Sequence, residues 1–441
     1  MLFCHAPIVT DDIIAAQMRW LYSLLLYLLT PLVLMYLFFR GLRSRDYLSR
    51  WSERFGFFDP PGQTGGIVVH AVSMGEVNAA STLVRELARR YPDDPLYLTT
   101  FTPTGSDRVR ELFGNTLFHV YVPLDLPGAV RRFFDRVRPR MLVILETEIW
   151  PNMYHEASAR GIPILVANAR ISDRSIGSYR RFHRLIAPAL AQVSMIGAQS
   201  VQDAARLAEI GAGEEQLTVT GNLKFDVNLP ASLSEEGDAI RTAWGTHRRV
   251  LLAGSTHEGD EIPVLNTFSR ILGEFPDALL VLVPRHPERF GRAAQAVRNK
   301  GLSLALRSAG PSCSADTQCF LIDTMGELLR YYSACDIAFV GGTFENLGGH
   351  NLLEPAALGK PILVGPHTYN SVDITQQLLA CGAALQLGGE AEFEQAVRSL
   401  FNEPERRDRM GRAGIELVKS GQGAVERTLL LVDQLITRAA G

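Results

Sequence analysis

The sequence lacks several patterns that would assign it to a common class of protein. Its 441 residues contain neither a GxGxxG fingerprint nor a GxxxxGK[S/T] loop, which disfavours a dinucleotide-binding Rossmann site and a P-loop ATPase. Cysteine is scarce, and the five cysteines form no CxxC pair and have no histidine nearby at zinc-binding spacing. This usage is typical of a reduced cytosolic protein and predicts neither a structural zinc site nor a redox pair.

An excess of either charge is also lacking. Lys and Arg number 44 against 47 Asp and Glu, which gives a formal net charge of −3. A body so close to neutral predicts no nucleic-acid partner. His257 and His286 each follow a predicted strand, but no acidic cluster accompanies them at ligand spacing, so we expect no bound metal.

Charge is absent from one long segment near the N-terminus. Residues Trp20 to Phe39 are uncharged, and as a helix they would rise about 30 Å, enough to cross the hydrocarbon core of a bilayer. Pro31 would kink this helix, which membrane helices tolerate. A cleaved signal peptide would have a shorter apolar region followed by small residues, whereas Arg40 and Arg43 follow here. The segment predicts a single transmembrane anchor over residues 20–39.

The two flanks of this segment differ in charge. Asp11 and Asp12 precede it, and a group of arginines follows it: Arg40, Arg43, Arg45, Arg50 and Arg54. By the positive-inside rule, this asymmetry places the folded body in the cytoplasm. We interpret residues 40–65 as a basic juxtamembrane segment. Residues 1–19 are interpreted as an N-terminal extension of the kind that an over-extended gene model adds, since Met18 would make a natural start.

From residue 66 onward the chain alternates apolar strands with amphipathic helices, first in one half and then in a second. The predicted strands are 67–72, 96–101, 117–125, 141–146, 162–170 and 194–200, then 249–256, 278–285, 320–324, 337–342 and 361–366. Such alternation predicts parallel sheets covered by helices on both faces. The expected fold class is α/β, with two doubly wound Rossmann-like domains, 66–227 and 247–441, that face a cleft. The C-terminal helices are assigned to the second domain.

A polar stretch separates the two halves. Residues 228–246 include Pro230 and show no apolar periodicity, so they predict an interdomain linker. A surface excursion within one domain would have a similar sequence.

The segment from Phe339 to Pro366 combines a strand, a glycine pair, a helix start and a second strand. Gly341 and Gly342 permit a turn with positive φ and close backbone approach. Asn351 stands at an expected helix N-cap with Glu354 three residues later, and the free N–H groups of such a terminus attract phosphate or carboxylate. The pattern predicts a nucleotide pocket, and the alternative is an ordinary loop in which the two side chains only cap each other.

Acidic side chains follow two of the predicted strands. Glu76 falls in the first turn of a helix, where it would either complement the helix dipole or act as a general base at the end of a strand. Glu146 and Glu148 end another strand. Successive strand residues point to opposite faces, so if that strand continued only one of them would face the cleft.

Cationic and phosphate-binding groups follow other strands. Lys224 would supply positive charge to a developing anion, and the alternative is a salt bridge to Asp226 or another acid. The loops 254–257 and 284–287 place Ser, Thr, His and Arg side chains behind two strands of the second half, a combination that suits a phosphate.

The segment 168–184 is rich in arginine. It indicates either a solvated basic helix or a surface for anionic lipid headgroups or an acidic lipid substrate. The residues assigned to this face are Arg170, Arg174, Arg180 and Arg181.

Taken together, the motifs resemble one family, the 3-deoxy-D-manno-octulosonic acid (Kdo) transferases of lipopolysaccharide synthesis. The resemblance runs from Trp20 nearly to the C-terminus, and as an ordered set the motifs are highly specific. They are RWSERFG (50–56), HAVSMGE (70–76), ETEIWPN (146–152), NARISDRS (168–175), GNLKFD (221–226), GSTHEGDE (254–261), PRHPERF (284–290) and GGHNLLEPAALGKP (348–361). Two departures are Thr343, where serine is usual, and Leu352, where proline often stands.

The resemblance implies a GT-B glycosyltransferase that moves Kdo from CMP-Kdo to a lipid A precursor (lipid IVA) with inversion. It implies no metal and no cofactor apart from the substrate CMP-Kdo, and a place at the cytoplasmic side of the inner membrane beside anionic lipids. The acceptor would bind the N-terminal domain and the donor the C-terminal domain. Glu76 matches the catalytic base, and Glu146 and Lys224 match residues that stabilise the transition state.

The donor site combines the residues that match this family with the phosphate-binding groups identified from the sequence alone. Its predicted members are Ser255, Thr256, Pro284, Arg285, His286, Met325, Gly326, Glu327, Asn351, Leu352, Leu353 and Glu354. Two other functions stay open at this point. A GT-B-like nucleotide-sugar epimerase would share the pocket but needs no membrane segment, and a membrane-tethered protein would bind a nucleotide sugar without catalysis.

Overall fold

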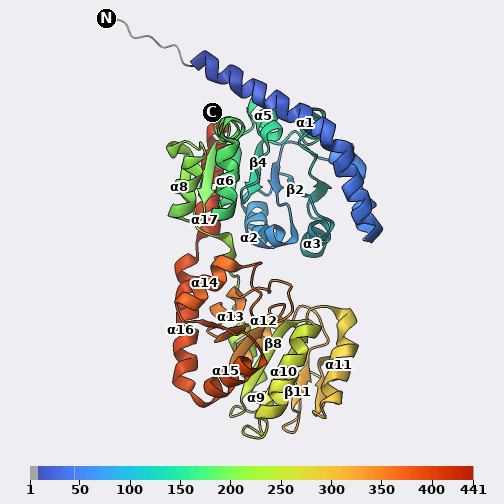
Figure 1. The fold of residues 1–441 in the computed structure, drawn as a ribbon, viewed down its shortest axis with the longest axis vertical. Helices are drawn as coiled ribbons and strands as arrows, with labels where there is room; N and C mark the ends of the chain where they lie inside the picture. Colours follow the sequence, from blue (N-terminus) through green and yellow to red (C-terminus); the bar gives the residue numbers. More distant parts are fainter. Residues whose placement is uncertain (1–7, 44, 441) are drawn as a thin grey trace, which may run out of the picture. The chain divides into compact units, whose positions relative to one another are not determined.

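The structure is a computed structural model that describes residues 8–43 and 45–440, with the side chains of residues 13–42, 47–173 and 175–439. The chain forms two compact units. Unit 1 runs to Asp226 and resumes at Gln422, and unit 2 comprises Val227–Gly421. Each unit is built around its own parallel sheet (Figure 1).

Unit 1 contains a seven-stranded parallel sheet in the order β3-β2-β1-β4-β5-β6-β7. Its strands are β1 (Ile67–His70), β2 (Leu96–Thr100), β3 (Phe118–Tyr121), β4 (Met141–Leu145), β5 (Ile164–Ala169), β6 (Met195–Ala198) and β7 (Leu217–Val219). Its helices are α1 (Ile8–Arg43), α2 (Met74–Arg90), α3 (Pro103–Phe113), α4 (Pro127–Val137), α5 (Pro151–Ala159), α6 (Asp173–Arg181), α7 (His183–Leu190), α8 (Val201–Glu209) and α17 (Ala424–Ala440). Neighbouring residues of a strand enter different cores. Val68 packs on one face of the sheet, and Ile67 and Val69 pack on the other.

Unit 2 contains a second seven-stranded parallel sheet, in the order β10-β11-β9-β8-β12-β13-β14. Its strands are β8 (Val250–Thr256), β9 (Leu279–Pro284), β10 (Leu304–Leu306), β11 (Cys319–Leu321), β12 (Ile337–Val340), β13 (Ile362–Val364) and β14 (Ala384–Gln386). Its helices are α9 (Leu233–Trp244), α10 (Glu258–Ile271), α11 (Phe290–Asn299), α12 (Leu328–Ala334), α13 (Leu353–Ala357), α14 (Val372–Ala380), α15 (Glu390–Asn402) and α16 (Pro404–Gly421).

The predicted α/β fold class is confirmed, and every predicted strand overlaps an observed one. In both sheets the strand order reverses beside the first strand of the unit, between β1 and β4 in unit 1 and between β8 and β12 in unit 2. Such topological switch points are where open α/β sheets bind ligands, beyond the carboxyl ends of the strands. Three strands went unpredicted, β7, β10 and β14. Each has three residues and lies at a sheet edge, where a strand is too short and too exposed to give an apolar run.

The predicted linker, residues 228–246, is wrong for most of its length. It contains α9, which packs against α12 within unit 2. Trp244 is 2% exposed and stacks on Tyr331 of α12 with ring centroids 5.9 Å apart. Leu233, Ile240 and Trp244 mark the packed side of the helix. This helical spacing is present in the sequence, but the many polar residues between these positions mask it.

The assignment of all C-terminal helices to the second domain is also wrong. Residues from Gln422 onward belong to unit 1, where α17 packs on α2, β5 and β6; in Figure 1 this red helix lies among the green elements of unit 1. Asp226 fixes its start, because the two carboxylate oxygens accept the N–H groups of Gly423 and Val425, each at 2.6 Å. A side chain 197 and 199 residues away in sequence from these two N–H groups thus caps the helix.

Two arginines of the predicted juxtamembrane segment face the protein body. Arg54 is 1% exposed, and its guanidinium lies 4.7 Å from the ring centroid of Phe101 and 4.4 Å from that of Tyr121. Arg50 also stacks on Tyr121 and pairs with Glu53 at 2.6 Å. These two cations therefore support the fold. The side chains of Arg43 and Arg45 lie outside the described residues.

The predicted apolar helix over residues 20–39 is part of α1, and residues 13–42 are long and apolar enough to cross a membrane. One face of α1 packs against α5 and α7 of unit 1. The contact is polar near its start, since Tyr22 donates a hydrogen bond to Asp125 Oδ2 at 3.1 Å and Ser23 donates one to Asn152 Oδ1 at 3.1 Å. Asp125 also accepts the N–H groups of Asn152 and Met153 at the start of α5. A buried carboxylate thus joins α1 to the body.

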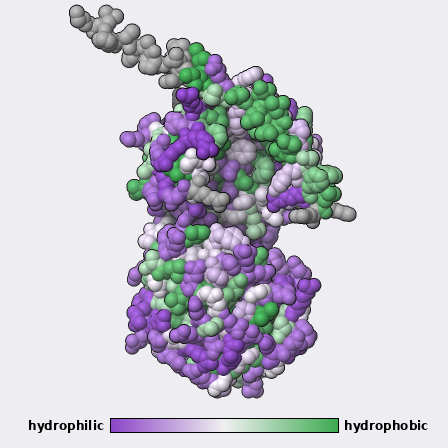
Figure 2. Space-filling view, viewed as in Figure 1, coloured by the Kyte–Doolittle hydropathy of each residue, from purple (hydrophilic) through white to green (hydrophobic). Residues whose placement is uncertain are grey.

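The opposite face of α1 is a continuous apolar surface. Figure 2 shows hydrophobic surface concentrated where α1 runs in Figure 1. Large side chains that are at least half exposed on this helix are Ile13, Trp20, Leu21, Leu25, Tyr27, Leu28, Leu32, Met35, Tyr36, Phe39 and Leu42. An apolar surface of this extent marks contact with a membrane or with another protein.

The cap on α17 gives a test of the division into units. Replacing Asp226 by alanine removes an acceptor for two N–H groups, which should cost about 1–2 kcal/mol and lower the melting temperature of the purified protein by about 2–4 °C. The control is Asp107→Ala, because Asp107 makes only an exposed pair with Arg110 and such changes have little effect. Equal melting temperatures for the two variants would contradict this role of Asp226.

Candidate active site

The switch point of the first sheet brings three glutamates together. Glu76 lies in the first turn of α2, directly after β1. Its Oε2 accepts the N–H of Val72 at 2.8 Å and its Oε1 accepts the hydroxyl of Ser73 at 3.2 Å. The carboxylate thus caps the start of α2. Because an anion is also favoured at this end of a helix, the structural role predicted as one alternative is present.

The path of the backbone after β4 brings Glu146 and Glu148 to the same place. Glu146 has φ 58°, a left-handed conformation that costs a non-glycine residue about 1–3 kcal/mol and is often found at functional sites. The strand ends at Leu145, so the expected alternation of faces does not apply. Both acids act on Glu76, since each contributes a negative charge that disfavours its ionisation. The condition for that expectation, a strand that continues past Glu146, is therefore not met.

Burial and this crowding change the proton affinity of two carboxyls. Burial first, and then the charges of Glu146 and Glu148, raise the pKa of Glu76 to about 8, against the opposing effect of the Val72 N–H group. Burial and the charge of Glu146 raise the pKa of Glu148 to about 7. Glu76 therefore combines a position at the carboxyl end of a strand with a basicity well above that of an ordinary glutamate.

Lys224 is positioned by contacts at the end of β5. It lies in a short 3₁₀ helix, Leu223–Phe225, that packs against α2 and α17. Asn168, buried in β5 with φ 57°, accepts the N–H of Leu223 at 3.0 Å. The alternative salt bridge to Asp226 is not formed, because the Asp226 carboxylate binds the start of α17.

The predicted basic face divides into several environments. Arg180, at the end of α6, pairs with Glu209 of α8 on the surface. The backbone of Arg170 follows β5 and is bound on both sides by the Thr147 hydroxyl. Arg181 is also in α6, whereas the side chain of Arg174 lies outside the described residues. The chain continues from α6 into α7, which packs against α1. The basic residues therefore come directly before a helix that contacts the apolar helix.

In unit 2, the segment at the end of β8 (residues 255–257, the β8 loop) and the segment after β12 (residues 341–352, the β12 loop) meet at the second switch point. Ser255 has φ 54°, and the pairing of β8 with β9 is irregular at this residue. Gly341 passes so close that an added Cβ would lie 2.4 Å from the carbonyl oxygen of Ser255. The predicted close approach at the glycine pair is therefore present. Thr256 is fully buried and its hydroxyl donates to Glu261 at 3.3 Å, so its side chain supports the loop.

Three more predicted donor residues lie at the end of β9. Pro284, the last residue of the strand, is buried, Arg285 is partly exposed and His286 is exposed. The N–H of Arg285 donates to the carbonyl of Thr256 at 3.0 Å. This bond ties the β9 loop to the β8 loop and leaves the guanidinium of Arg285 at the loop surface.

The capping pattern at Asn351 is present in modified form. Helix α13 begins at Leu353, so its N-cap is Leu352 and not Asn351. Asn351 still accepts the N–H of Leu353 at 3.0 Å and donates to Glu354 at 2.9 Å. With five residues, α13 has a weaker dipole than the expected helix. The side chains of Leu352 and Leu353 are 2% and 1% exposed, so these two predicted donor residues could contribute only backbone groups to a site.

The predicted donor residues Met325 to Glu327 form a turn before α12. Met325 is 52% exposed and Gly326 has φ 82°. Glu327 accepts hydrogen bonds from Arg307 and Arg330, each at 3.0 Å. These pairs hold the turn in place from both sides.

Asp260 and His350 are residues of this site that the sequence analysis did not select. Asp260 is fully buried and accepts four N–H groups, two of which belong to His257 and Gly342, at 2.9 and 2.7 Å. It therefore joins the β8 loop to the β12 loop. His350 Nε2 lies 3.0 Å from His257 Nε2. Asp260 lies in the motif GSTHEGDE, three residues after His257, so the sequence carried a signal for the contact between these two residues. The other partners of Asp260, and the partner of His350, are distant in sequence.

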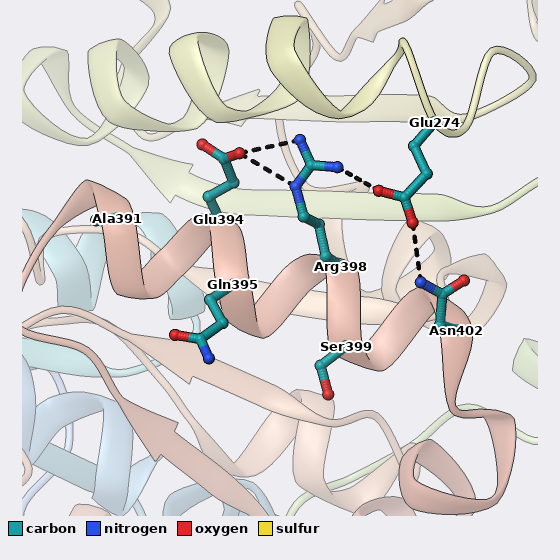
Figure 3. A pocket seen from close by; sticks show the side chains of 7 residues that line it. All are labelled: Glu274, Ala391, Glu394, Gln395, Arg398, Ser399 and Asn402. Carbon is teal, nitrogen blue, oxygen red and sulfur yellow. Dashed lines mark hydrogen bonds and ion pairs between the residues drawn. The ribbon is translucent and has the colours of Figure 1, made fainter.

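A surface hollow on unit 2 lies apart from these residues. It is lined by Glu274, Ala391, Glu394, Gln395, Arg398, Ser399 and Asn402 (Figure 3). Its charges pair with one another, since Arg398 binds both Glu394 and Glu274, and Asn402 donates to Glu274 at 3.0 Å. None of the predicted site residues lines it. Across the described part of the chain, no group of three or more His, Cys, Asp or Glu side chains is arranged to hold a metal.

Comparison with solved structures identifies the fold. A UDP-GlcNAc 2-epimerase from Neisseria meningitidis superimposes with a TM-score of 0.54 at 16% identity, covering 84% of this chain and 100% of that one. A glycosyltransferase from Rickettsia africae gives a TM-score of 0.52 at 12% identity, covering 85% and 99%. These likenesses show that the chain has the GT-B architecture, which both transferases and epimerases adopt.

Comparison with sequences identifies the family. Residues 49–227 match the family model described as 3-deoxy-D-manno-octulosonic-acid transferase (kdotransferase). The chain is 40% identical over 425 residues to the 3-deoxy-D-manno-octulosonic acid transferase of Haemophilus influenzae, which covers 95% of this chain and 99% of that protein. It is 37% identical over 426 residues to the enzyme of the same name from Bordetella pertussis, covering 93% and 98%. Identity of this extent along nearly the whole of both chains shows that the protein belongs to the Kdo transferases and is a glycosyltransferase.

Proposed function

We propose that this protein transfers Kdo from CMP-Kdo to a hydroxyl of a lipid A precursor, lipid IVA, with inversion at the transferred carbon and with Glu76 as the general base. The observation that carries the proposal is the environment of Glu76, a carboxyl at the β1–β4 switch point whose pKa is raised to about 8 by burial and by Glu146 and Glu148. A general base is most effective when its pKa lies near the working pH.

One displacement accounts for the reaction. The Glu76 carboxylate removes the proton from the acceptor hydroxyl while the oxygen attacks the anomeric carbon of Kdo. The bond from that carbon to the phosphate oxygen breaks, and CMP leaves with the electron pair. Attack from the side opposite to CMP inverts the anomeric centre, and Glu76 ends the step as a neutral carboxylic acid. Since a single base is sufficient for this step, we propose no metal and no cofactor.

The proposed roles of Glu146 and Lys224 follow from charge. Glycosyl transfer passes through a transition state with oxocarbenium-like positive charge on the sugar. The Glu146 carboxylate, which lies near enough to Glu76 to affect its pKa, would stabilise that charge. Lys224 lies in the 3₁₀ helix that packs on α2. It would stabilise the negative charge that develops on the leaving group.

Unit 2 is proposed to hold the donor. Arg285 would bind the phosphate, since a guanidinium can bind phosphate with two parallel hydrogen bonds. Asn351 and Glu354 are joined by a hydrogen bond of 2.9 Å. They would bind a ribose hydroxyl and fix the conformation of the backbone between them. The turn at Met325 to Glu327, fixed by Arg307 and Arg330, would border the nucleotide.

The membrane environment is proposed from α1 and the basic face. The exposed apolar side of α1 would be embedded in the inner membrane with both units on the cytoplasmic side. Arg170, Arg174, Arg180 and Arg181 would then attract the phosphates of the acceptor and of anionic lipids. Because α7 packs against both α1 and α6, the basic segment would then lie close to the membrane, where the acceptor is held.

Glu76→Gln tests the base. Glutamine keeps the shape of the side chain but cannot accept the proton, so transfer from CMP-Kdo to lipid IVA should fall by about 10²–10⁴-fold, while binding of CMP stays unchanged. The matched control is Glu86→Gln on the same helix, where Glu86 makes only a surface pair with Arg89. Transfer is measured by mass spectrometry of the lipid product. Near-normal transfer by the Glu76 variant would contradict the mechanism.

The exposed face of α1 gives a test of the membrane contact. Arginine at both Leu25 and Leu32, which are 52% and 55% exposed, should disfavour insertion by about 2.5–3.5 kcal/mol for each residue. We expect the double variant to move from the membrane to the soluble fraction on ultracentrifugation. Val201→Arg, a change at a 75% exposed apolar residue elsewhere on unit 1, is the control. Full membrane retention of the double variant would show that α1 is not the contact.

A further inference from the structure

Three histidines gather at the switch point of the second sheet. His257 follows β8, His286 follows β9, and His350 lies in the loop after β12. The rings of His257 and His350 are stacked, with centroids 5.3 Å apart and planes within 9°, and their Nε2 atoms are 3.0 Å apart. The ring of His286 meets that of His257 edge-on at 5.4 Å. His286 is exposed and His257 and His350 are partly exposed, so a ligand can reach the group.

The contact between His257 and His350 limits how many protons the pair can hold. Two nitrogens 3.0 Å apart share one hydrogen bond, which requires a proton on one of them and a lone pair on the other. Two neutral rings satisfy this condition, and so does one neutral ring with one cationic ring. Two cationic rings would place two N–H groups head to head. The pair therefore carries a charge of zero or plus one and takes up at most one proton.

The surroundings keep the pair neutral while the site is empty. Burial, followed by the effects of His257, Arg285 and His286, lowers the pKa of His350 to about 4. Burial is also the main reason that the pKa of His257 lies below its ordinary value. An anion that binds beside the rings would compensate for the lost solvation and raise the pKa of the pair, because a negative charge favours the cationic form.

The acids near these rings are already engaged. Asp260 accepts four backbone N–H groups, Glu345 accepts the N–H of Gly259 at 3.0 Å, and Arg289 pairs with both Glu258 and Glu261. The other charged group that acts on His350 is Arg285, a cation on the β9 loop. The site thus presents a guanidinium and a pair of rings able to become cationic.

We propose that His257 and His350, with His286 beside them, form a proton-linked site for an anionic group of the sugar-nucleotide donor. This inference rests on the proposed function, in which unit 2 holds CMP-Kdo. That donor carries two anionic groups, the phosphodiester and the carboxylate of the sugar. Binding of either group is accompanied by uptake of one proton by the His257–His350 pair, which gives a charge-assisted hydrogen bond in place of a neutral one.

Proton uptake fixes the pH dependence of donor binding. Since the bound form holds one more proton than the free form, the Kd of CMP-Kdo should rise as the pH increases, by up to about tenfold for each pH unit. A glutamine at position 350 retains hydrogen-bonding groups but cannot become cationic. His350→Gln should therefore weaken donor binding about tenfold at pH 6.5 and reduce its dependence on pH between 6 and 8, since only His257 can then take up the proton.

The experiment measures direct binding of freshly prepared CMP-Kdo by calorimetry, using Glu76→Gln protein so that no transfer occurs and Glu76 does not titrate. His350→Gln and His257→Gln are each added to this background, with His247→Gln at an exposed site of unit 2 as the control. Melting curves check that each variant is folded. Two variants are used because His350 is the more buried of the pair.

Binding of CMP at pH 6.5 identifies the anionic group. A parallel loss of CMP and CMP-Kdo binding assigns the site to the phosphate, and loss of CMP-Kdo binding alone assigns it to the sugar carboxylate. A donor Kd that stays within about twofold of the parent protein in both histidine variants, with the same pH dependence, would overturn the inference. Absence of CMP-Kdo binding in the parent protein would instead overturn the proposed role of unit 2 as the donor site.

Discussion

The parallel arrangement of both sheets is the constraint on which the rest of the structure depends. All strands of a parallel sheet end at the same edge, so the side chains that follow them are brought together there although they are distant in sequence. In unit 1 this edge carries Glu76 after β1 and Glu146 after β4. In unit 2 it carries His257 after β8 and His350 in the loop after β12. Both groups lie where the strand order reverses.

Each edge holds groups whose preferred charge state is set by burial and by neighbouring charges. In unit 1, burial and like charges favour the protonated form of Glu76. The folded state then holds a proton that the unfolded state has lost, so the contribution of Glu76 to the free energy of unfolding falls as the pH rises from the unfolded-state pKa of about 4.3 toward the folded-state pKa of about 8. In unit 2, burial favours the neutral form of His350. Asp260 holds that second group in place through four backbone N–H groups. The strain and burial at these edges are typical of functional sites.

The sequence predicts the parts of the fold that periodicity and apolar runs encode. It predicted the α/β class and the central strands, and it missed the three-residue edge strands and α9, whose polar residues mask its packed side. It placed Glu76 and Glu146 at strand ends, but not the approach of Glu148, because the left-handed turn at Glu146 has no signature in a residue that is not glycine. Asp260, His350 and the cap from Asp226 to α17 depend on pairs far apart in sequence, which local patterns do not encode.

The central claim is that Glu76 is an unusually strong base for a glutamate because burial, and then the charges of neighbouring carboxylates, raise its pKa. The direct measurement is the pH dependence of kcat/KM for the lipid acceptor at saturating CMP-Kdo, in the wild-type protein and in Glu146→Gln. The account predicts that the wild-type rate rises with pH through a midpoint of about 8, and that the midpoint moves to lower pH when the charge of Glu146 is removed. A wild-type midpoint near the ordinary glutamate value of about 4.3, or a midpoint that Glu146→Gln leaves unchanged, would contradict it.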